Sequence, residues 1–290
     1  MRYRIGITLG DPAGIGPEIV RAAMASGRLP RDAEYSVIGP SPDYSLGQPT
    51  PESARSALRA LEEGVALALR GEIDAVVTGP IHKARMYEIG FKFPGQTEFF
   101  ADRCGTSNFA MLLTGGKLTV ALVTAHLPLR EVSSALRREE IVRVGLLLEN
   151  FLQRRGIQNP RIAVAGFNPH AGESGALGRE EMETIAPAVS ELQQTCGLRA
   201  TVAGPFSPDT LFHHAAHGDW DGVLCMYHDQ GLIPLKLHAF HEGVNVTLGL
   251  PFPRTSPDHG TAFEIAGKNV ARPDSMIAAI NLAVELARKS

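Results

Sequence analysis

The sequence predicts an α/β fold in which helices cover both faces of a largely parallel sheet. Short apolar segments rich in β-branched residues alternate along the chain with longer segments of helical period. Several of the short segments are apolar almost throughout, as expected of strands that are covered on both faces. The chain has 290 residues, which is enough for one large domain or for two ordinary domains around a hydrophobic core.

These patterns assign strands and helices in order along the chain. The expected strands are YRIGITLG (3–10), YSVIG (35–39), DAVVTG (74–79), FAMLLTG (109–115), LTVALVTAH (118–126), PRIAVAGFNPH (160–170), DGVLCMYHD (221–229) and GVNVTLG (243–249). The expected helices are amphipathic and span residues 16–26, 52–70, 132–155, 179–195 and 274–288. Residues 39–53 are rich in proline, glycine and serine, so we expect an exposed loop there.

Composition argues against several classes of protein. The net charge is −3 and the basic residues are scattered, so we expect no nucleic-acid partner. The three cysteines have no CxxC spacing, which argues against a disulfide framework and against a cysteine-built zinc site. No apolar run approaches the roughly 18–20 residues of a membrane span, and the N-terminus lacks the apolar core of a signal peptide. We therefore expect a cytoplasmic protein with no membrane partner.

Polar and ionisable residues gather directly after the expected strands. They are Asp11, His82, Lys83, His126, His170, His228 and Asp229. In an open α/β sheet the carboxyl ends of the strands form the crevice where ligands bind. This placement favours an enzyme.

Three of the ten histidines terminate separate apolar strands: His126, His170 and His228. Their wide spacing suits ligands carried by different strands, and three neutral imidazoles would leave a divalent ion with open positions, as in catalytic sites. Three unrelated histidines that are hydrogen-bonded near strand ends would give the same pattern. The polar setting of the remaining candidates predicts solvated surface positions for His213, His214, His217, His238 and His241.

The C-terminal third contains a second group of chemically notable residues. Lys236 and Arg254 are suited to a phosphate or carboxylate, and Asn245 interrupts an apolar strand, where a buried amide needs partners or a ligand. The segment DHGTAFEIAGK (258–268) places a Gly–Thr turn at the start of a short helix, a favourable position for an anionic cofactor group. The N-terminal GDPAGIGPE lacks the GxGxxG spacing of a dinucleotide fingerprint, so a turn that shapes the floor of the site is expected there.

Several long blocks of this sequence closely resemble the 4-hydroxythreonine-4-phosphate dehydrogenase family of vitamin B6 biosynthesis. The blocks are GDPAGIGPEI, VTGPIHK, GQTEFFADRCGT, VTAHLPLREV, GFNPHAGESGALGREE, PDTLF, MYHDQGLIPLK and GVNVTLGLPFPRTSPDHGTAFEIAGK. The resemblance implies a fold like that of isocitrate and isopropylmalate dehydrogenases. It implies two α/β/α domains with a cleft between them, residues 1–86 with 270–290 and residues 87–269. It also implies a homodimer whose partner subunit completes the active site.

The resemblance implies NAD- or NADP-dependent oxidation of 4-phosphohydroxy-L-threonine at C3, followed by β-decarboxylation to 3-amino-2-oxopropyl phosphate and carbon dioxide. The implied ligands of one divalent metal ion (zinc, magnesium, cobalt or manganese) are His126, His170 and His228. The implied substrate contacts are Gln96, Thr97, Lys236, Asn245 and Arg254, and the implied cofactor contacts are Asp258, His259, Gly260, Thr261 and Asn269. Lys236 and Asp229 are both candidates for the general base.

Two departures from the family pattern bear on the substrate. Gln96 stands where the family usually has a histidine, and the segment after YSVIGP is shorter than expected. The same chemistry on 4-phospho-D-threonate or 4-phospho-D-erythronate is therefore an alternative. A non-catalytic protein that binds a phosphorylated metabolite is an alternative of another class. Retention of Lys236, Asn245 and Arg254 argues against a further relative whose cyclohexadiene diol substrate has no phosphate.

Overall fold

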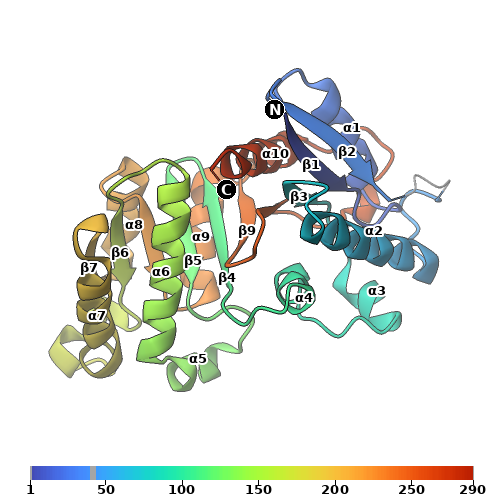
Figure 1. The fold of residues 1–290 in the computed structure, drawn as a ribbon. Helices are drawn as coiled ribbons and strands as arrows, with labels where there is room; N and C mark the ends of the chain where they lie inside the picture. The colour runs from blue at the N-terminus through green and yellow to red at the C-terminus, as the bar shows by residue number, and fades with distance from the viewer. Residues whose placement is uncertain (1, 40–43, 290) are drawn as a thin grey trace. The chain divides into compact units, whose positions relative to one another are not determined.

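The computed structural model describes residues 2–39 and 44–289, which divide into two compact units (Figure 1). Unit 1 comprises Met1–Ser107 and His241–Ser290, and unit 2 is Asn108–Phe240. The expected domain boundaries, after residues 86 and 269, differ from this division. Residues 87–107 and 241–269 belong to unit 1 because their phenylalanines pack into its core, as Phe91, Phe99 and Phe252 show.

Unit 1 is built on strands in the spatial order β2-β1-β3-β10-β9. All neighbours are parallel except β9, which runs antiparallel to β10. The strands are β1 (Tyr3–Thr8), β2 (Ala33–Ile38), β3 (Ala75–Thr78), β9 (Val244–Leu248) and β10 (Arg254–Pro257). The carboxyl ends of the parallel strands share one edge of the sheet, so the residues that follow them are neighbours in space.

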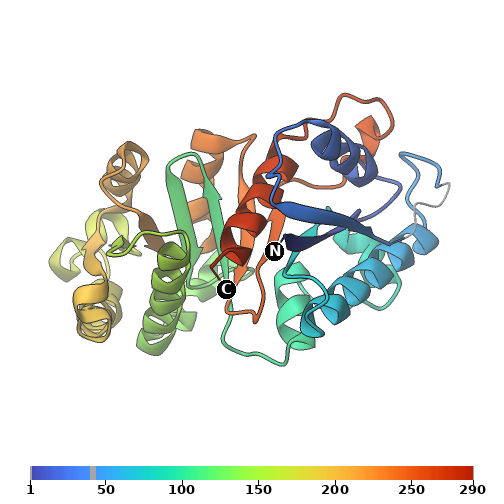
Figure 2. The same ribbon diagram turned by 45° about the horizontal axis from the view of Figure 1, so that its top comes forward.

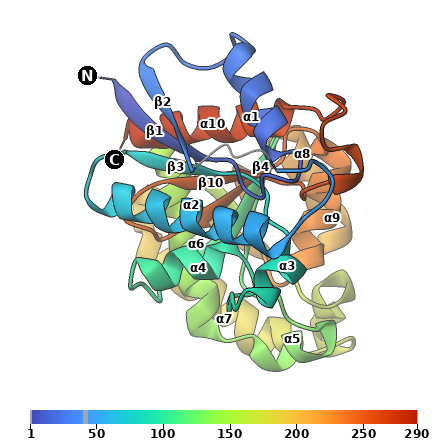
Figure 3. The same cartoon turned by 90° about the vertical axis from the view of Figure 1, so that its right-hand side faces the viewer.

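Helices cover both faces of the unit 1 sheet. Helix α10 and its neighbour α1 lie on one face and α2 lies on the other (Figure 3). The helices are α1 (Gly16–Ala25), α2 (Pro51–Leu69), α3 (Lys83–Glu88), α4 (Gln96–Arg103), the 3₁₀ turn η4 (Phe263–Ile265) and α10 (Asp274–Ala287). Thr50 begins α2 with a capping box, because its hydroxyl accepts from the Ser53 backbone N–H and the Ser53 hydroxyl accepts from the Thr50 N–H.

Unit 2 has the strand order β4-β5-β8-β6-β7. Strand β4 is antiparallel to β5, and β5, β8, β6 and β7 are parallel to their neighbours. The strands are β4 (Ala110–Gly115), β5 (Leu118–Leu122), β6 (Arg161–Ala165), β7 (Thr201–Phe206) and β8 (Gly222–Cys225). Residues of β5 and β8 are buried throughout, which explains their unbroken apolar sequences.

The helices of unit 2 also form two layers around its sheet. Helices α6 and α7 pack on one face, and α8 and α9 pack on the other (Figures 1 and 2). The elements are α5 (Leu129–Ala135), α6 (Arg138–Arg154), η1 (Pro169–Gly175), η2 (Glu181–Ile185), α7 (Ala186–Cys196), η3 (Gly197–Arg199), α8 (Pro208–His217) and α9 (His228–Ala239).

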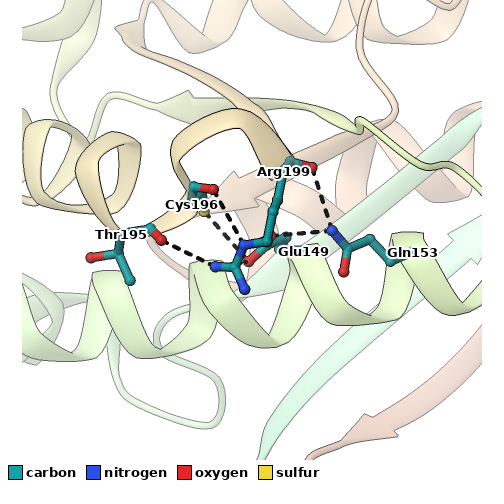
Figure 4. Close-up of polar contacts among 5 residues, drawn as sticks. All are labelled: Glu149, Gln153, Thr195, Cys196 and Arg199. Carbon is teal, nitrogen blue, oxygen red and sulfur yellow. Dashed lines mark hydrogen bonds and ion pairs between the residues drawn. The ribbon is translucent and has the colours of Figure 1, made fainter.

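A buried carboxylate joins α6 to the end of α7 (Figure 4). The Glu149 side chain is 5 % exposed and pairs with Arg199 Nε at 3.3 Å. The same carboxylate accepts from Cys196 Sγ at 3.5 Å and from Gln153 Nε2 at 3.3 Å. Arg199 also donates to the carbonyls of Thr195 and Cys196, which are orphan acceptors at the helix terminus. Arg199 thus pairs with the buried charge of Glu149 and also donates hydrogen bonds to the last carbonyls of α7.

The predicted α/β class is confirmed, and each predicted strand segment overlaps a strand. The strands within 118–126, 160–170 and 221–229 end earlier than predicted, at Leu122, Ala165 and Cys225. The sequence did not predict β7 or β10, nor α3, α4, α8 and α9. The helix expected over 132–155 is two helices, because Leu136 and Arg137 adopt extended conformations between α5 and α6. In the loop expected over 39–53, helix α2 already begins at Pro51, and residues 40–43 lie outside the described residues. None of the helices in the described part of the chain is long and apolar enough to cross a membrane.

Candidate active site

The three predicted metal-binding histidines follow three adjacent parallel strands of unit 2. The strand order places β8 between β5 and β6, and His126, His228 and His170 follow β5, β8 and β6 respectively. The sheet topology therefore brings all three to one edge, as the ends of parallel strands require.

Two of these histidines form a close pair. The ring centroids of His126 and His228 are 5.9 Å apart. Hydrogen bonds hold the two segments together, since Val123 N–H donates to the Cys225 carbonyl at 2.9 Å and the Thr124 hydroxyl donates to the Met226 carbonyl at 2.7 Å. The pair borders a pocket of about 250 Å³ that is lined by Ala125, His126, Leu127, Leu129, Val132, Tyr227, His228 and Asp229.

Asp229 orients the imidazole of His228. Its Oδ1 lies 2.7 Å from His228 Nδ1, so Nδ1 carries a hydrogen, and in the neutral imidazole the lone pair is then on Nε2. A carboxylate bonded to the second ring nitrogen is the usual support of a metal-binding histidine. Asp229 was predicted as a candidate base, and its 70 % exposed side chain also stands at the pocket.

His170 lies in an unusual turn that faces the start of α8. Residues 170–174 have left-handed backbone angles, with φ of 51° at His170. The charge of His170, after the Ser207 hydroxyl, contributes to holding the pKa of Asp209 below its usual value. Among residues 2–39 and 44–289, no three His, Cys, Asp or Glu side chains form a group that could hold a metal ion. The structure thus pairs two of the predicted ligands and leaves the third outside the pair.

Gln230 is a site residue that the sequence did not reveal. It is 6 % exposed, its Oε1 accepts from Met226 N–H at 2.7 Å, and its Nε2 donates to the Gly166 carbonyl at 2.6 Å. It therefore joins the end of β8 to the segment that carries His170. Its position in MYHDQG, beside His228 and Asp229, was the only sequence signal for this role.

A second polar cluster lies in unit 1 around Arg254. The β9–β10 register places Thr247 opposite Arg254, and Asn245 stands two residues before Thr247, on the same face. Arg254 Nη1 donates to the Thr247 hydroxyl at 3.2 Å, and Thr97 Oγ1 lies 3.2 Å from that same hydroxyl oxygen. The structure therefore brings Thr97, Asn245 and Arg254 to one face, as the prediction of a shared ligand requires.

Arg254 is buried, and its hydrogen-bond partners among the described residues are neutral groups of Thr78, Gln96 and Thr247. It is 2 % exposed, and its Nη2 donates to the Thr78 hydroxyl at 2.5 Å and to Gln96 Oε1 at 2.9 Å. Within the described residues, its Nε has no hydrogen-bond partner. Burial lowers the pKa of Arg254 to about 9, a loss that the nearby charge of Glu98 partly opposes. A buried cation held by neutral groups is suited to receive an anion.

The remaining predicted substrate residues differ in position. Gln96 is fixed by its two bonds, because its Oε1 accepts from Arg254 while its Nε2 donates to the Gly79 carbonyl at 3.2 Å. Asn245 Oδ1 is buried and has no hydrogen-bond partner among the described residues. Lys236 lies on α9 in unit 2, eight residues and roughly 12 Å of helix rise beyond His228.

The predicted cofactor segment packs against the glycine-rich turn after β1. The Thr261 carbonyl accepts from Ile15 N–H at 2.9 Å, and Glu18 Oε2 accepts from Gly267 N–H at 2.9 Å. Asp11, at the end of β1, is 1 % exposed, and burial raises the pKa of its carboxyl. The predicted cofactor contacts lie along one segment after β10: Asp258, His259, Gly260, Thr261 and Asn269. Thr261 is buried, whereas Gly260 and Asn269 are exposed.

The five histidines that were predicted to lie on the solvated surface are exposed. His213, His214 and His217 lie on α8 rather than in an irregular segment, and all are exposed. His214 Nδ1 lies 2.9 Å from Asp219 Oδ2, and His217 Nδ1 lies 2.7 Å from the His213 carbonyl. His238 on α9 and His241 just after it are exposed too.

This fold and these clusters define an α/β enzyme with paired histidines in one unit and a buried cation in the other. Comparison with known proteins gives the family. A family profile described as "Pyridoxal phosphate biosynthetic protein PdxA" matches residues 18–283. The chain belongs to this family, whose members are dehydrogenases, and it is therefore an oxidoreductase. Membership of a dehydrogenase family implies a nicotinamide cofactor.

Individual relatives agree along nearly the whole chain. The 4-hydroxythreonine-4-phosphate dehydrogenase of Caulobacter vibrioides is 44 % identical over 98 % of both chains. The crystal structure of the enzyme of that name from Klebsiella pneumoniae has a TM-score of 0.81 at 37 % identity, and covers 98 % of this chain and 99 % of its own. A terephthalate 1,2-cis-dihydrodiol dehydrogenase from Burkholderia xenovorans has a TM-score of 0.70 at 28 % identity, over 98 % of each chain.

Proposed function

We propose that this chain oxidises the C3 hydroxyl of 4-phosphohydroxy-L-threonine with NAD or NADP, and that β-decarboxylation then gives 3-amino-2-oxopropyl phosphate and carbon dioxide. The observation that carries the proposal is the buried guanidinium of Arg254, in a chain whose relatives are named for a phosphorylated substrate. A phosphate would give the guanidinium a charged hydrogen-bond partner, whereas its partners in the described part of the chain, Thr78, Gln96 and Thr247, are neutral.

The cluster around Arg254 would bind the phosphate end of the substrate. The Nε of Arg254 and the Oδ1 of Asn245, which have no hydrogen-bond partner in the described part of the chain, lie on one sheet face with the hydroxyl of Thr97. Gln96 presents its oxygen to Arg254, so it orients the guanidinium rather than neutralising it. Lys236 remains a proposed contact from α9.

The donor chemistry at the unit 2 strand ends fits one divalent metal ion. His126, His228 and His170 would hold it, and Asp229 already fixes the His228 tautomer that leaves Nε2 for a ligand. When bound, such an ion would supply Lewis acidity to a substrate hydroxyl and to the carbonyl that replaces it. Zinc, magnesium, cobalt and manganese all remain candidates.

Asp229 is the better placed of the two candidate bases. It lines the same pocket as His126 and His228, and only its Oδ1 is engaged with His228, which leaves Oδ2 for a proton. Lys236 stands two helical turns away along α9. We therefore assign removal of the hydroxyl proton to Asp229, and a bound nicotinamide would supply the hydride acceptor. The proposed cofactor contacts are Asp258, His259, Gly260, Thr261 and Asn269.

An exposed apolar face on α9 supports the proposed homodimer. Ile233, Leu237 and Phe240 are 66 %, 89 % and 69 % exposed and are spaced to share one side of the helix. Helix α9 also carries His228, Asp229 and Lys236, so a second copy docked here would stand next to site residues.

Steady-state rates on three substrates, each with NAD and with NADP, test the proposal. We expect kcat/KM to be highest for 4-phosphohydroxy-L-threonine. A higher value for 4-phospho-D-threonate or 4-phospho-D-erythronate would transfer the assignment to the sugar-acid substrate. Absence of reduced nicotinamide with all three would contradict the proposed chemistry and favour a binding protein.

A further inference from the structure

The turn that carries His170 adopts a backbone conformation that its sequence does not favour. Residues 170–174 all have φ between 43° and 80°, although only Gly172 among them is a glycine. A non-glycine residue in the left-handed region costs on the order of 1–3 kcal/mol and persists only where its surroundings impose it. Some contact must therefore hold this turn.

The buried carboxylate of Glu181 is that contact. The residue is 3 % exposed, and its Oε1 accepts from the backbone N–H groups of Phe167 and Asn168, both at 2.7 Å. Its Oε2 accepts from Asn168 Nδ2 at 2.9 Å. The three bonds fix the chain immediately before His170, and charge-assisted bonds to a buried carboxylate are among the stronger ones.

The turn also lies in direct van der Waals contact with this carboxylate. A Cβ added at Gly172 would lie 2.6 Å from Glu181 Oε2, and one added at Gly166 would lie 2.9 Å from the Ala171 Cβ. Glu181 is the first residue of the π-helical turn η2, which directly precedes α7. The carboxylate therefore belongs to a helical turn, and it fills the space beside Gly172 in the His170 turn.

We propose that Glu181 is a positioning residue for His170. Its carboxylate stabilises the left-handed turn, and the turn determines the position of the His170 imidazole at the carboxyl edge of the sheet. The consequence for metal binding rests on the proposed function, whereas the effect on the turn does not.

Hydrogen exchange of the metal-free chain tests the first step. Glu181→Ala should speed exchange of the Phe167 and Asn168 amides by about tenfold or more, because both lose the carboxylate oxygen to which they donate. Exchange of the Ala171 amide should also speed up, because its bond to the Asn168 carbonyl depends on the turn that Glu181 holds. Glu181→Gln should give an intermediate increase, because its amide oxygen can still accept from the backbone while its NH₂ faces that of Asn168. Glu183→Ala is the matched control in the same π-helical turn, with a side chain that is 59 % exposed. Wild-type exchange in both Glu181 variants would overturn the proposal.

Zinc affinity of the same variants tests the second step, with His170→Ala as the reference. Loss of a group that supports a ligand typically weakens metal binding by roughly 10–100-fold, so Glu181→Gln and Glu181→Ala should bind zinc at least tenfold more weakly. Glu183→Ala should match the wild type. If His170→Ala weakens binding but the Glu181 variants do not, the positioning role is refuted. If His170→Ala binds zinc as the wild type does, the proposed metal site fails, and the exchange data alone decide whether Glu181 holds the turn. If Glu181→Ala fails to fold, Glu181→Gln supplies both measurements.

Discussion

Arg254 and Cys196 are both buried, and burial moves their pKa values in opposite directions. It lowers the pKa of Arg254 to about 9 and, with the adjacent Glu149 carboxylate, raises the pKa of Cys196 to about 12. In each case the neutral form is favoured because the charged form loses its hydration. The arginine gains from an incoming anion, whereas the thiol becomes unreactive.

Replacing Arg254 with lysine should raise KM for the phosphorylated substrate by roughly tenfold to a hundredfold, because a forked set of charge-assisted bonds is lost. The charge is kept, so kcat should fall much less than kcat/KM. Steady-state kinetics measure both values. Arg55→Lys, on the surface of α2, is the control and should leave both unchanged. An unaltered KM in Arg254→Lys would exclude this residue from the phosphate site.

Alkylation of the folded chain with iodoacetamide at pH 8 should modify Cys104 first and leave Cys196 and Cys225 essentially untouched. Cys104 is only partly buried, and the thiolate is the reactive form. The raised pKa means that reaction at Cys196 should increase as pH rises toward about 12, above the ordinary value of 9.0. Mass spectrometry after timed quenching measures the order, and the unfolded chain, in which all three should react alike, is the control. Early labelling of Cys196 would contradict its described environment.

At the scale of elements, the strands were predictable because buried parallel strands have unbroken apolar sequences. Helix α9 was not predictable. It contains Pro234, buries Gly231 and exposes Ile233 and Leu237, so its apolar residues do not mark its inner face. The hydrogen bonds of Gln230 and Glu181 could not be predicted from the sequence either, because each residue bonds to backbone groups of a segment that is distant in the sequence.

Arg199→Met should destabilise the chain by about 1–2 kcal/mol, because it leaves the buried Glu149 carboxylate short of its cation. The matched control joins the same two helices at the surface, where Arg138 pairs with Glu191. Arg138→Met should change the free energy of unfolding by less than about 0.5 kcal/mol, as is usual for exposed pairs. Urea unfolding measures both variants. Equal losses of unfolding free energy in the two variants would show that the ion pair of the buried Glu149 contributes no more than an exposed pair does.

At the scale of the molecule, the sequence predicts a candidate site because the ends of buried strands can be recognised in it. The edge that collects His126, His170 and His228 follows from the β5-β8-β6 order, and the order itself could not be read from the sequence. The predicted domain boundaries differ from the two compact units, since residues 87–107 pack through aromatic contacts with distant segments, such as that of Phe100 with Phe252.

Leu237→Glu should convert a dimer into a monomer in size-exclusion chromatography with light scattering, because it places a charge on the exposed apolar face of α9. Leu198→Glu is the control, since Leu198 is 98 % exposed and lies on η3, outside that face. An unchanged mass for Leu237→Glu would remove α9 from the dimer interface.

Formation of reduced nicotinamide from 4-phosphohydroxy-L-threonine by the chelator-treated chain, followed as zinc, magnesium, cobalt or manganese is added back, tests the central claim most directly. The account predicts no turnover until a divalent ion is restored, and then a rate that saturates with ion concentration in the wild type but not in His170→Ala. A full rate in the treated chain before any ion is added, with His170→Ala equally active, would contradict it.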